Sequence, residues 1–182
     1  FRPEHSTVTA LYDFNEAVAA GFNKEAPPDR TILVQLDLSK AFDMVSLEKL
    51  INEVNLTSLP ESVKRWLNCY LSGRQSKVQF RNQLSESRNV RTGVPQGAVT
   101  SPLLFSFYLS KIPKPPANIS IIQYADDISI YTSGRNIQGM TDIINRYLET
   151  VLEYLKEREL LISPEKSTVT LFTPDRRQGN IH

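Results

Sequence analysis

The stretch from Ile119 to Tyr131 constrains the fold more than any other part of this sequence. Two runs rich in β-branched residues flank a short centre formed by Ala125, Asp126 and Asp127. Such runs around a tight turn predict a β-hairpin that carries two adjacent carboxylates at its tip. Adjacent carboxylates repel each other, which raises a pKa unless a cation neutralises them. The hairpin therefore indicates a magnesium site, because Mg²⁺ prefers oxygen ligands and often uses carboxylates together with substrate phosphates.

A third aspartate strengthens this interpretation. Residues 31–38 form a mostly apolar run that carries Asp37 near its end. A run of this kind predicts a strand covered on both faces, and hence a central strand of a sheet. Three carboxylates in one pocket can hold two divalent ions about 3.5–4 Å apart, as in two-metal phosphoryl-transfer sites. Without Asp37, a solvated Asp-Asp turn would be the better explanation of the hairpin tip.

The remaining hydrophobic patterns predict a mixed fold. Helical spacing of apolar residues recurs in five segments, and Pro164 separates the last of them from a final strand at 167–172. Antiparallel strands with helices packed on one face of the sheet indicate an α+β fold. The predicted helices cover residues 1–22, 46–54, 60–72, 102–109 and 140–155, and a polar hairpin covers residues 74–91.

The composition argues against a disulfide-stabilised domain, against binding driven by overall charge and against a membrane span. The net charge is +1 and Cys69 is the only cysteine, so the chain has no intrachain disulfide and no overall basic character. From Lys64 to Arg91, however, seven basic residues face a single acid, Glu86. This local excess suits phosphate contacts, with a solvated surface as the alternative. No apolar run approaches the roughly 18 residues that a transmembrane helix requires.

Five segments, in this order along the chain, resemble motifs of reverse transcriptases. Each could arise by chance, whereas five with compatible spacing could hardly do so. Within that family the chain is most similar to the non-LTR (LINE-type) retrotransposon enzymes of jockey-like elements, over essentially its whole length. The segments are Phe1–Thr7 (FRPEHST), Leu36–Asp43 (LDLSKAFD), Gly93–Phe105 (GVPQGAVTSPLLF), Tyr124–Asp127 (YADD) and Ile162–Ser167 (ISPEKS).

The resemblance implies a fold and a subdomain plan. The fold would be a ferredoxin-like polymerase palm, an antiparallel sheet backed by helices, with partial fingers and no thumb. The expected parts are a fingers remnant at 1–30, the first part of the palm at 31–60, a fingers insertion with the basic hairpin at 61–92, and the second part of the palm at 93–182.

The resemblance also implies an activity. Family members are RNA-directed DNA polymerases that add dNMP to a primer 3′-end with two Mg²⁺ ions, or with Mn²⁺ in their place, during retrotransposition. The implied partners are an RNA template, a DNA primer, dNTPs and the remainder of a longer polypeptide with fingers, thumb and endonuclease, without a membrane. A nuclear stage with cytoplasmic assembly is implied, and weak dNTP binding is expected of this piece alone.

Site residues carry over by position. Asp37 and Asp126 match the main metal ligands, and Asp127 matches the third carboxylate. Phe42 matches the bulky residue under the nucleotide sugar, where a ring leaves no room for a 2′-hydroxyl. Its alternative role is core packing. Lys166 matches a lysine that protonates pyrophosphate, and its alternative is an exposed lysine beside a strand.

Other positions match residues that contact nucleic acid in the family, and a few depart from the family's pattern. Gln96 and Gly97 match the segment that contacts the nascent base pair and its template. The family commonly has Ser at Ala98, Leu at Thr100, Gly at Glu159 and Asn at Ser163. Because glycine suits a left-handed helix end, the departure at Glu159 raises the alternative that Lys166 is displaced. The expected template and primer contacts in the basic hairpin are Arg74, Lys77, Arg81, Arg88 and Arg91.

Two rival functions remain open from the sequence. A truncated or domesticated element could act as a non-catalytic nucleic-acid-binding domain, although such a role would not need three aspartates. An RNA-dependent RNA polymerase palm would have to admit the 2′-hydroxyl, which Phe42 disfavours.

Overall fold

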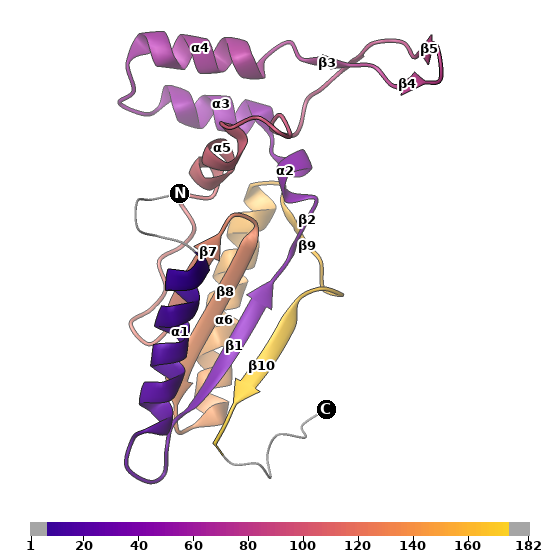
Figure 1. The fold of residues 1–182 in the computed structure, drawn as a ribbon. Coiled ribbons are helices and arrows are strands. Elements are labelled where there is room, and N and C mark those ends of the chain that lie inside the picture. Colours follow the sequence, from indigo (N-terminus) through magenta and orange to yellow (C-terminus); the bar gives the residue numbers. More distant parts are fainter. Residues whose placement is uncertain (1–6, 175–182) are drawn as a thin grey trace. The chain divides into compact units, whose positions relative to one another are not determined.

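The computed structural model describes residues 7–174 and divides into two compact units (Figure 1). The first six residues of the opening motif, Phe1–Thr7, lie outside the described residues. No helix within residues 7–174 is long and apolar enough to cross a membrane. The sheet unit comprises Phe1–Ser39, Ile112–Glu157 and Leu161–His182, and the helix-hairpin unit comprises Lys40–Lys111 and Arg158–Leu160.

The sheet unit is built on four antiparallel strands in the order β10-β1-β8-β7. In chain order these are the fourth, first, third and second strands, the arrangement of a ferredoxin-like βαββαβ unit. The α+β prediction and the central position of the apolar strand are therefore confirmed. The strands are β1 (Arg30–Leu36), β7 (Ser120–Tyr124), β8 (Asp127–Gly134) and β10 (Thr168–Phe172), and the short β2 (Leu38–Ser39) pairs with β9 (Leu161–Ile162).

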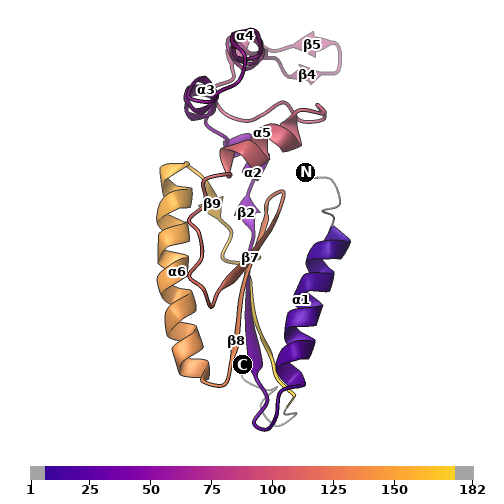
Figure 2. The same ribbon diagram turned by 90° about the vertical axis from the view of Figure 1, so that its left-hand side faces the viewer.

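Helices cover both faces of this sheet. Figure 2 shows α1 (Thr7–Phe22) and α6 (Ile137–Glu157) on opposite sides. On the α1 side, Phe14 packs edge-to-face against Tyr131, with ring centroids 5.1 Å apart. The prediction that helices pack on one face is wrong, because residues 31–34 of β1 are all buried and alternate between the two faces. Two apolar faces need two covering layers.

The helix-hairpin unit has its own core. Leu50, Leu71, Phe105 and Tyr108 are almost completely buried in it. The predicted helices and the polar hairpin of this region are confirmed. They are α2 (Ala41–Met44), α3 (Leu47–Asn55), α4 (Glu61–Leu71) and α5 (Ser101–Tyr108), with hairpin pairs β3 (Gln75–Ser76) with β6 (Arg88–Asn89) and β4 (Gln79–Phe80) with β5 (Gln83–Leu84).

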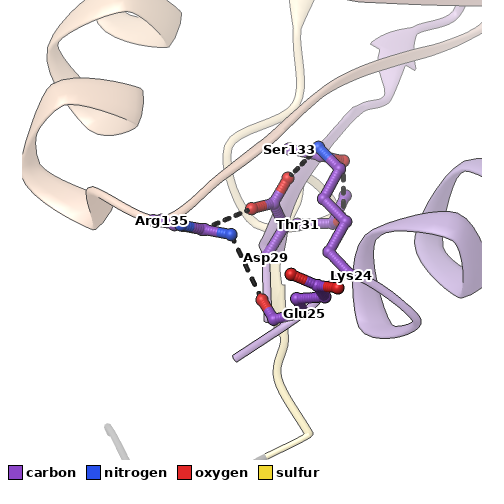
Figure 3. A network of polar contacts seen from close by, with 6 residues as sticks. All are labelled: Lys24, Glu25, Asp29, Thr31, Ser133 and Arg135. Carbon is purple, nitrogen blue, oxygen red and sulfur yellow. Dashed lines mark hydrogen bonds and ion pairs between the residues drawn. The ribbon is translucent and has the colours of Figure 1, made fainter. Parts of the chain in front are cut away.

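A polar network fastens the sheet unit at the end of β1 far from Asp37 (Figure 3). The buried Asp29 carboxylate lies 2.6 Å from Lys24 Nζ and 3.6 Å from Arg135 Nε. Arg135 also donates a hydrogen bond to the backbone oxygen of Glu25. The loop between α1 and β1 is thus tied to the residue that follows β8, which keeps the start of the central strand in register.

A second charged cluster supports the helix-hairpin unit. Arg158 pairs with Glu53, and Lys111 Nζ lies 3.3 Å from the same carboxylate oxygen. The Arg158 guanidinium also lies 5.0 Å from the centre of the Tyr108 ring. The Tyr108 hydroxyl donates a hydrogen bond to the backbone oxygen of Arg158. Burial acts to raise the pKa of Glu53, but hydrogen bonding and charge from Arg158 and Lys111 outweigh it and lower the pKa below 4.5.

Replacing Glu53 is expected to destabilise this unit in a pH-dependent way. Glu53→Gln leaves the mostly buried Arg158 without its counter-charge, which should lower the free energy of unfolding by about 3 kcal/mol at pH 7. A lowered folded-state pKa means that the ion pair stabilises fully above pH 4.5 and fades as the pH falls through that lowered pKa. Denaturant titrations should show the variant and the parent converging in acid. A constant difference down to low pH would contradict this role.

Candidate active site

The sheet register brings the first aspartate beside the hairpin pair. Leu36, the last residue of β1, pairs with Ile128 of β8, so the next positions along the register are Asp37 and Asp127. Residues opposite each other on adjacent strands share one face of the sheet. Asp126 lies directly before Asp127 in a two-residue turn, in which Ala125 has a φ of +51°. The predicted hairpin is confirmed, and its tip lies next to the end of the central strand.

The electrostatics of this tip favour a cation. Burial raises the pKa of Asp127, and the negative charges of Asp126 and Asp37 raise it further. Within residues 7–174, the buried Oδ2 atom of Asp37 has no hydrogen-bond partner, and Lys166 Nζ lies 3.8 Å from it. Carboxylate oxygens are the ligands that Mg²⁺ prefers, so these residues fit a divalent metal.

The carboxylates do not complete a metal site by themselves. Within residues 7–174, no group of three or more His, Cys, Asp or Glu side chains is arranged to hold a metal ion. That Asp37, Asp126 and Asp127 together hold metal ions stays a prediction. Mg²⁺ commonly completes its coordination shell with water and substrate phosphates.

The segment from Ser163 to Ser167 wraps around Asp37. The Ser163 amide donates to the Asp37 backbone oxygen at 2.8 Å, and the Asp37 amide lies 3.2 Å from Ser167 Oγ. Lys166 Nζ is 3.8 Å from Asp37 Oδ2. Glu159 adopts a φ of +59°, the left-handed conformation expected where the family has glycine. Lys166 is therefore not displaced from Asp37 in the structure. The role of Lys166 as a proton donor stays a prediction.

The helix-hairpin unit contains a cavity of about 370 Å³ beside Phe42. The Phe42 ring is half-buried and stacks on the fully buried Phe105, with centroids 4.7 Å apart. Phe42 therefore contributes both to the core and to the cavity wall, so its two predicted roles do not exclude each other. The cavity is lined by Phe42, Gln96, Gly97, Ala98, Val99, Ser101 and Pro102.

Backbone contacts fix the turn that carries Gln96 and Gly97. The Gly93 amide donates to the Val45 oxygen at 2.8 Å, and the Val94 amide donates to the Phe42 oxygen at 3.0 Å. Gly93 has a φ of +88°, and a Cβ there would lie 3.1 Å from the Asp43 backbone oxygen, so only glycine suits this position.

Asp43, the last residue of the Leu36–Asp43 motif, contacts Gln96, a partner that the sequence did not predict for it. Gln96 Nε2 donates to Asp43 Oδ1 at 2.6 Å, although 53 residues separate the two. Local spacing carries no signal for such a pair. The contact follows from the backbone anchoring of the turn on the segment after Phe42.

The basic hairpin presents most of its charges to solvent. Lys77, Arg81, Arg88 and Arg91 are exposed, and none of them forms an ion pair within residues 7–174. The Arg81 guanidinium lies 5.4 Å from the centre of the Phe80 ring. Arg74 differs from the others, because its Nη1 donates to the Gly93 backbone oxygen at 2.6 Å. This hydrogen bond lets Arg74 hold the turn around Gly93 in place.

Relatives of this chain are known in insects. The Drosophila melanogaster protein described as "Probable RNA-directed DNA polymerase from transposon BS" is 31% identical over 180 residues, which cover 95% of this chain and 19% of that protein. The corresponding protein from transposon X-element is 29% identical, with 97% and 20% covered. The protein from mobile element jockey is 27% identical, with 94% and 19% covered. The chain thus spans about a fifth of the length of these relatives.

Solved structures support the fold. The structure of apo telomerase from Candida tropicalis matches with a TM-score of 0.60 at 13% identity, over 89% of this chain and 30% of that chain. Telomerase from Candida albicans, solved in complex with a fragment of telomeric RNA, matches with a TM-score of 0.59 at 14% identity, over 91% and 31%. At this identity the likeness concerns the fold alone.

Residues 1–180 match the family described as "Reverse transcriptase (RNA-dependent DNA polymerase)". This match covers nearly the entire chain. It agrees with the palm-like sheet, with the aspartates at the tip of that sheet and with the insect relatives. The chain belongs to the reverse transcriptase family, and its non-LTR retrotransposon relatives are the group that the motifs indicated.

Proposed function

We propose that this chain carries the catalytic palm of an RNA-directed DNA polymerase, which joins dNMP to the 3′-end of a primer during retrotransposition. The observation that carries the proposal is the register of β1 and β8, in which Leu36 pairs with Ile128, so that Asp37 and Asp127 each adjoin the last pair. The raised pKa of Asp127, to which the charges of Asp126 and Asp37 contribute, supports it.

Asp37, Asp126 and Asp127 would hold Mg²⁺, with phosphate oxygens of the substrate as further ligands. Two such ions, when bound, would make the primer 3′-hydroxyl a better nucleophile and neutralise charge on the leaving pyrophosphate. The chain's own residues orient the reactants. Lys166, beside Asp37, would give a proton to pyrophosphate.

The other proposed contacts concern the sugar and the nucleic acid. Phe42 would press against C2′ of the incoming sugar and exclude a 2′-hydroxyl, which favours dNTPs over rNTPs. Gln96 and Gly97 would contact the nascent base pair. Lys77, Arg81, Arg88 and Arg91 would contact template and primer phosphates, because they are exposed and unpaired with acids in the described part of the chain.

Primer extension tests the proposal. The chain, and a longer polypeptide that contains it, should be given a DNA primer on RNA and on DNA templates, with Mg²⁺ or Mn²⁺. Metal-dependent incorporation of dNTPs on the RNA template is expected from the longer polypeptide at least. Binding of the primer–template without incorporation by either protein would favour the non-catalytic alternative. A preference for rNTPs would favour an RNA polymerase.

A further inference from the structure

The basic hairpin that follows α4 is exposed along its whole length. Every residue from 75 to 89 is exposed, and Figure 1 shows β4 and β5 beyond β3, away from α4 of the same unit. Three large apolar side chains lie on this hairpin, namely Val78, Phe80 and Leu84, and each is more exposed than buried. Burial in the core therefore does not account for them.

A tight turn places an aromatic ring and a cation together at the tip of the hairpin. Phe80 pairs with Gln83, so Arg81 and Asn82 form a two-residue turn, and Arg81 has the positive φ of +53° that is typical of such turns. The Arg81 guanidinium lies 5.4 Å from the centre of the Phe80 ring. Phe80 is nevertheless 71% exposed, so much of its ring remains open to a ligand.

Hydrogen bonds hold the two strands behind this tip in one register. The Ser85 amide donates to the Val78 backbone oxygen at 2.9 Å, and the Val78 amide donates to Ser85 Oγ at 2.9 Å. These bonds adjoin the pairs of β4 with β5. The ring of Phe80 and the guanidinium of Arg81 are therefore carried by a paired hairpin rather than by an irregular loop.

The charges of the hairpin indicate which kind of partner suits the ring. Between residues 75 and 89 the cations are Lys77, Arg81 and Arg88, and the only acid is Glu86. In the described part of the chain, residues 7–174, none of these cations forms an ion pair. A strand of nucleic acid supplies phosphates for such cations and a base that stacks on an exposed ring. An apolar protein surface would leave the cations without counter-charges.

We propose that Phe80 and Arg81 form a stacking site for an unpaired base of single-stranded nucleic acid, while the neighbouring cations contact its phosphates. The proposal rests on the function proposed above, in which these cations contact template and primer phosphates. It adds that the hairpin distinguishes unpaired nucleotides from a duplex. A base inside a duplex is already stacked between its neighbours, so it offers no face to the Phe80 ring.

Binding to single-stranded and duplex oligonucleotides measures this preference in the polymerase that contains this chain. The labelled probes are oligouridylate, oligothymidylate and a long blunt-ended DNA duplex. Phe80→Leu keeps an apolar side chain but removes the aromatic face. It should weaken binding of the single strands about fivefold or more, the effect of losing one stacked base, and leave binding of the duplex as in the parent. Phe80→Trp should bind single strands as the parent does.

The salt dependence separates stacking from charge. For the single strands, Lys77→Gln should lower the slope of log K against log salt concentration by about 0.7, since one phosphate contact is lost. Phe80→Leu should lower the affinity and leave that slope unchanged. Leu84→Ala is the matched control, because Leu84 is also exposed but pairs with Gln79 in the register next to Phe80, which places it on the other face of the hairpin. It should bind both kinds of probe as the parent does.

Each outcome decides the proposal. A loss confined to single strands in Phe80→Leu, absent from Phe80→Trp, supports the stacking site, and the strand with the larger loss identifies RNA or DNA as its occupant. Equal losses for single strands and duplex overturn it, and so does a loss that Phe80→Trp shares.

Unchanged single-strand binding in folded Phe80→Leu also overturns the proposal. If that variant instead changes the oligomeric state of the polymerase, the ring belongs to a protein interface. Incorporation of dNTP by the parent is measured in the same preparation. Its absence would contradict the proposed function, whereas an active polymerase whose single-strand binding ignores Phe80 would contradict the stacking site alone.

Discussion

Asp126→Asn is expected to reduce metal-dependent dNTP incorporation by about 10³-fold or more in a polymerase that contains this chain, since a lost metal ligand withdraws several kcal/mol of transition-state stabilisation. The change replaces one carboxylate oxygen by an amide nitrogen, which does not ligate Mg²⁺. Asp126 lies in a hairpin turn outside the core, so the thermal unfolding temperature should hardly change. Single-nucleotide primer extension measures the effect.

The matched control for this prediction is Asp142→Asn. Asp142 is an exposed carboxylate on α6 of the same unit, where it accepts a hydrogen bond from Gln138. Removing its charge changes the net charge of the protein as much as Asp126→Asn does, so a difference between the two variants reports position rather than charge. Equal incorporation by the parent and by Asp126→Asn would remove Asp126 from the site.

Phe42→Ala is expected to admit ribonucleotides. Removing the ring leaves space for a 2′-hydroxyl, and relief of a steric overlap worth about 1–3 kcal/mol should lower the preference for dNTP over rNTP about 5- to 150-fold. Because Phe42 stacks on Phe105, the variant should also lose stability, by about 2–3 kcal/mol for a half-buried ring. Competition between dNTP and rNTP at one template position measures the preference independently of that loss.

Phe80→Ala is the matched control for the loss of an aromatic ring. Phe80 is an exposed phenylalanine of the basic hairpin and has no part in the cavity. Its replacement should leave the choice between sugars as in the parent. If Phe42→Ala discriminates as well as the parent does, the ring serves the core alone and the selection of sugars lies elsewhere.

The sequence predicted the elements of the fold more reliably than their layering. Periodicity located α3, α4, α5 and α6, because apolar spacing records directly which side of a helix is buried. The β7–β8 hairpin and the central β1 were equally legible. Which helix covers which face of the sheet could not be predicted. A strand with apolar residues on both faces shows that two covering layers are needed, but it does not show which helices form them. The short α2 and the β2–β9 pair escaped notice since a few residues carry no period.

The candidate site was legible where chemistry and register coincide. Asp37 directly follows β1 and Asp127 is the first residue of β8, and these two strands are paired. Predicting the two strands was therefore enough to suggest that the aspartates lie close together. The Asp43–Gln96 contact depends instead on how a glycine turn docks on a distant segment, which no local pattern encodes. The structural use of Arg74 was hidden for the same reason, since its partner is a backbone oxygen that can be identified only in the folded chain.

Binding of Mn²⁺ together with dTTP, followed by water-proton relaxation, tests most directly whether the strand-end aspartate and the hairpin pair form one metal site. The protein should enhance relaxation. Asp37→Asn and Asp127→Asn should each weaken Mn²⁺ binding by about tenfold or more, and Asp142→Asn should leave it as in the parent. Undiminished Mn²⁺ binding in folded Asp37→Asn would contradict a single shared site, because the central strand would then contribute nothing to it.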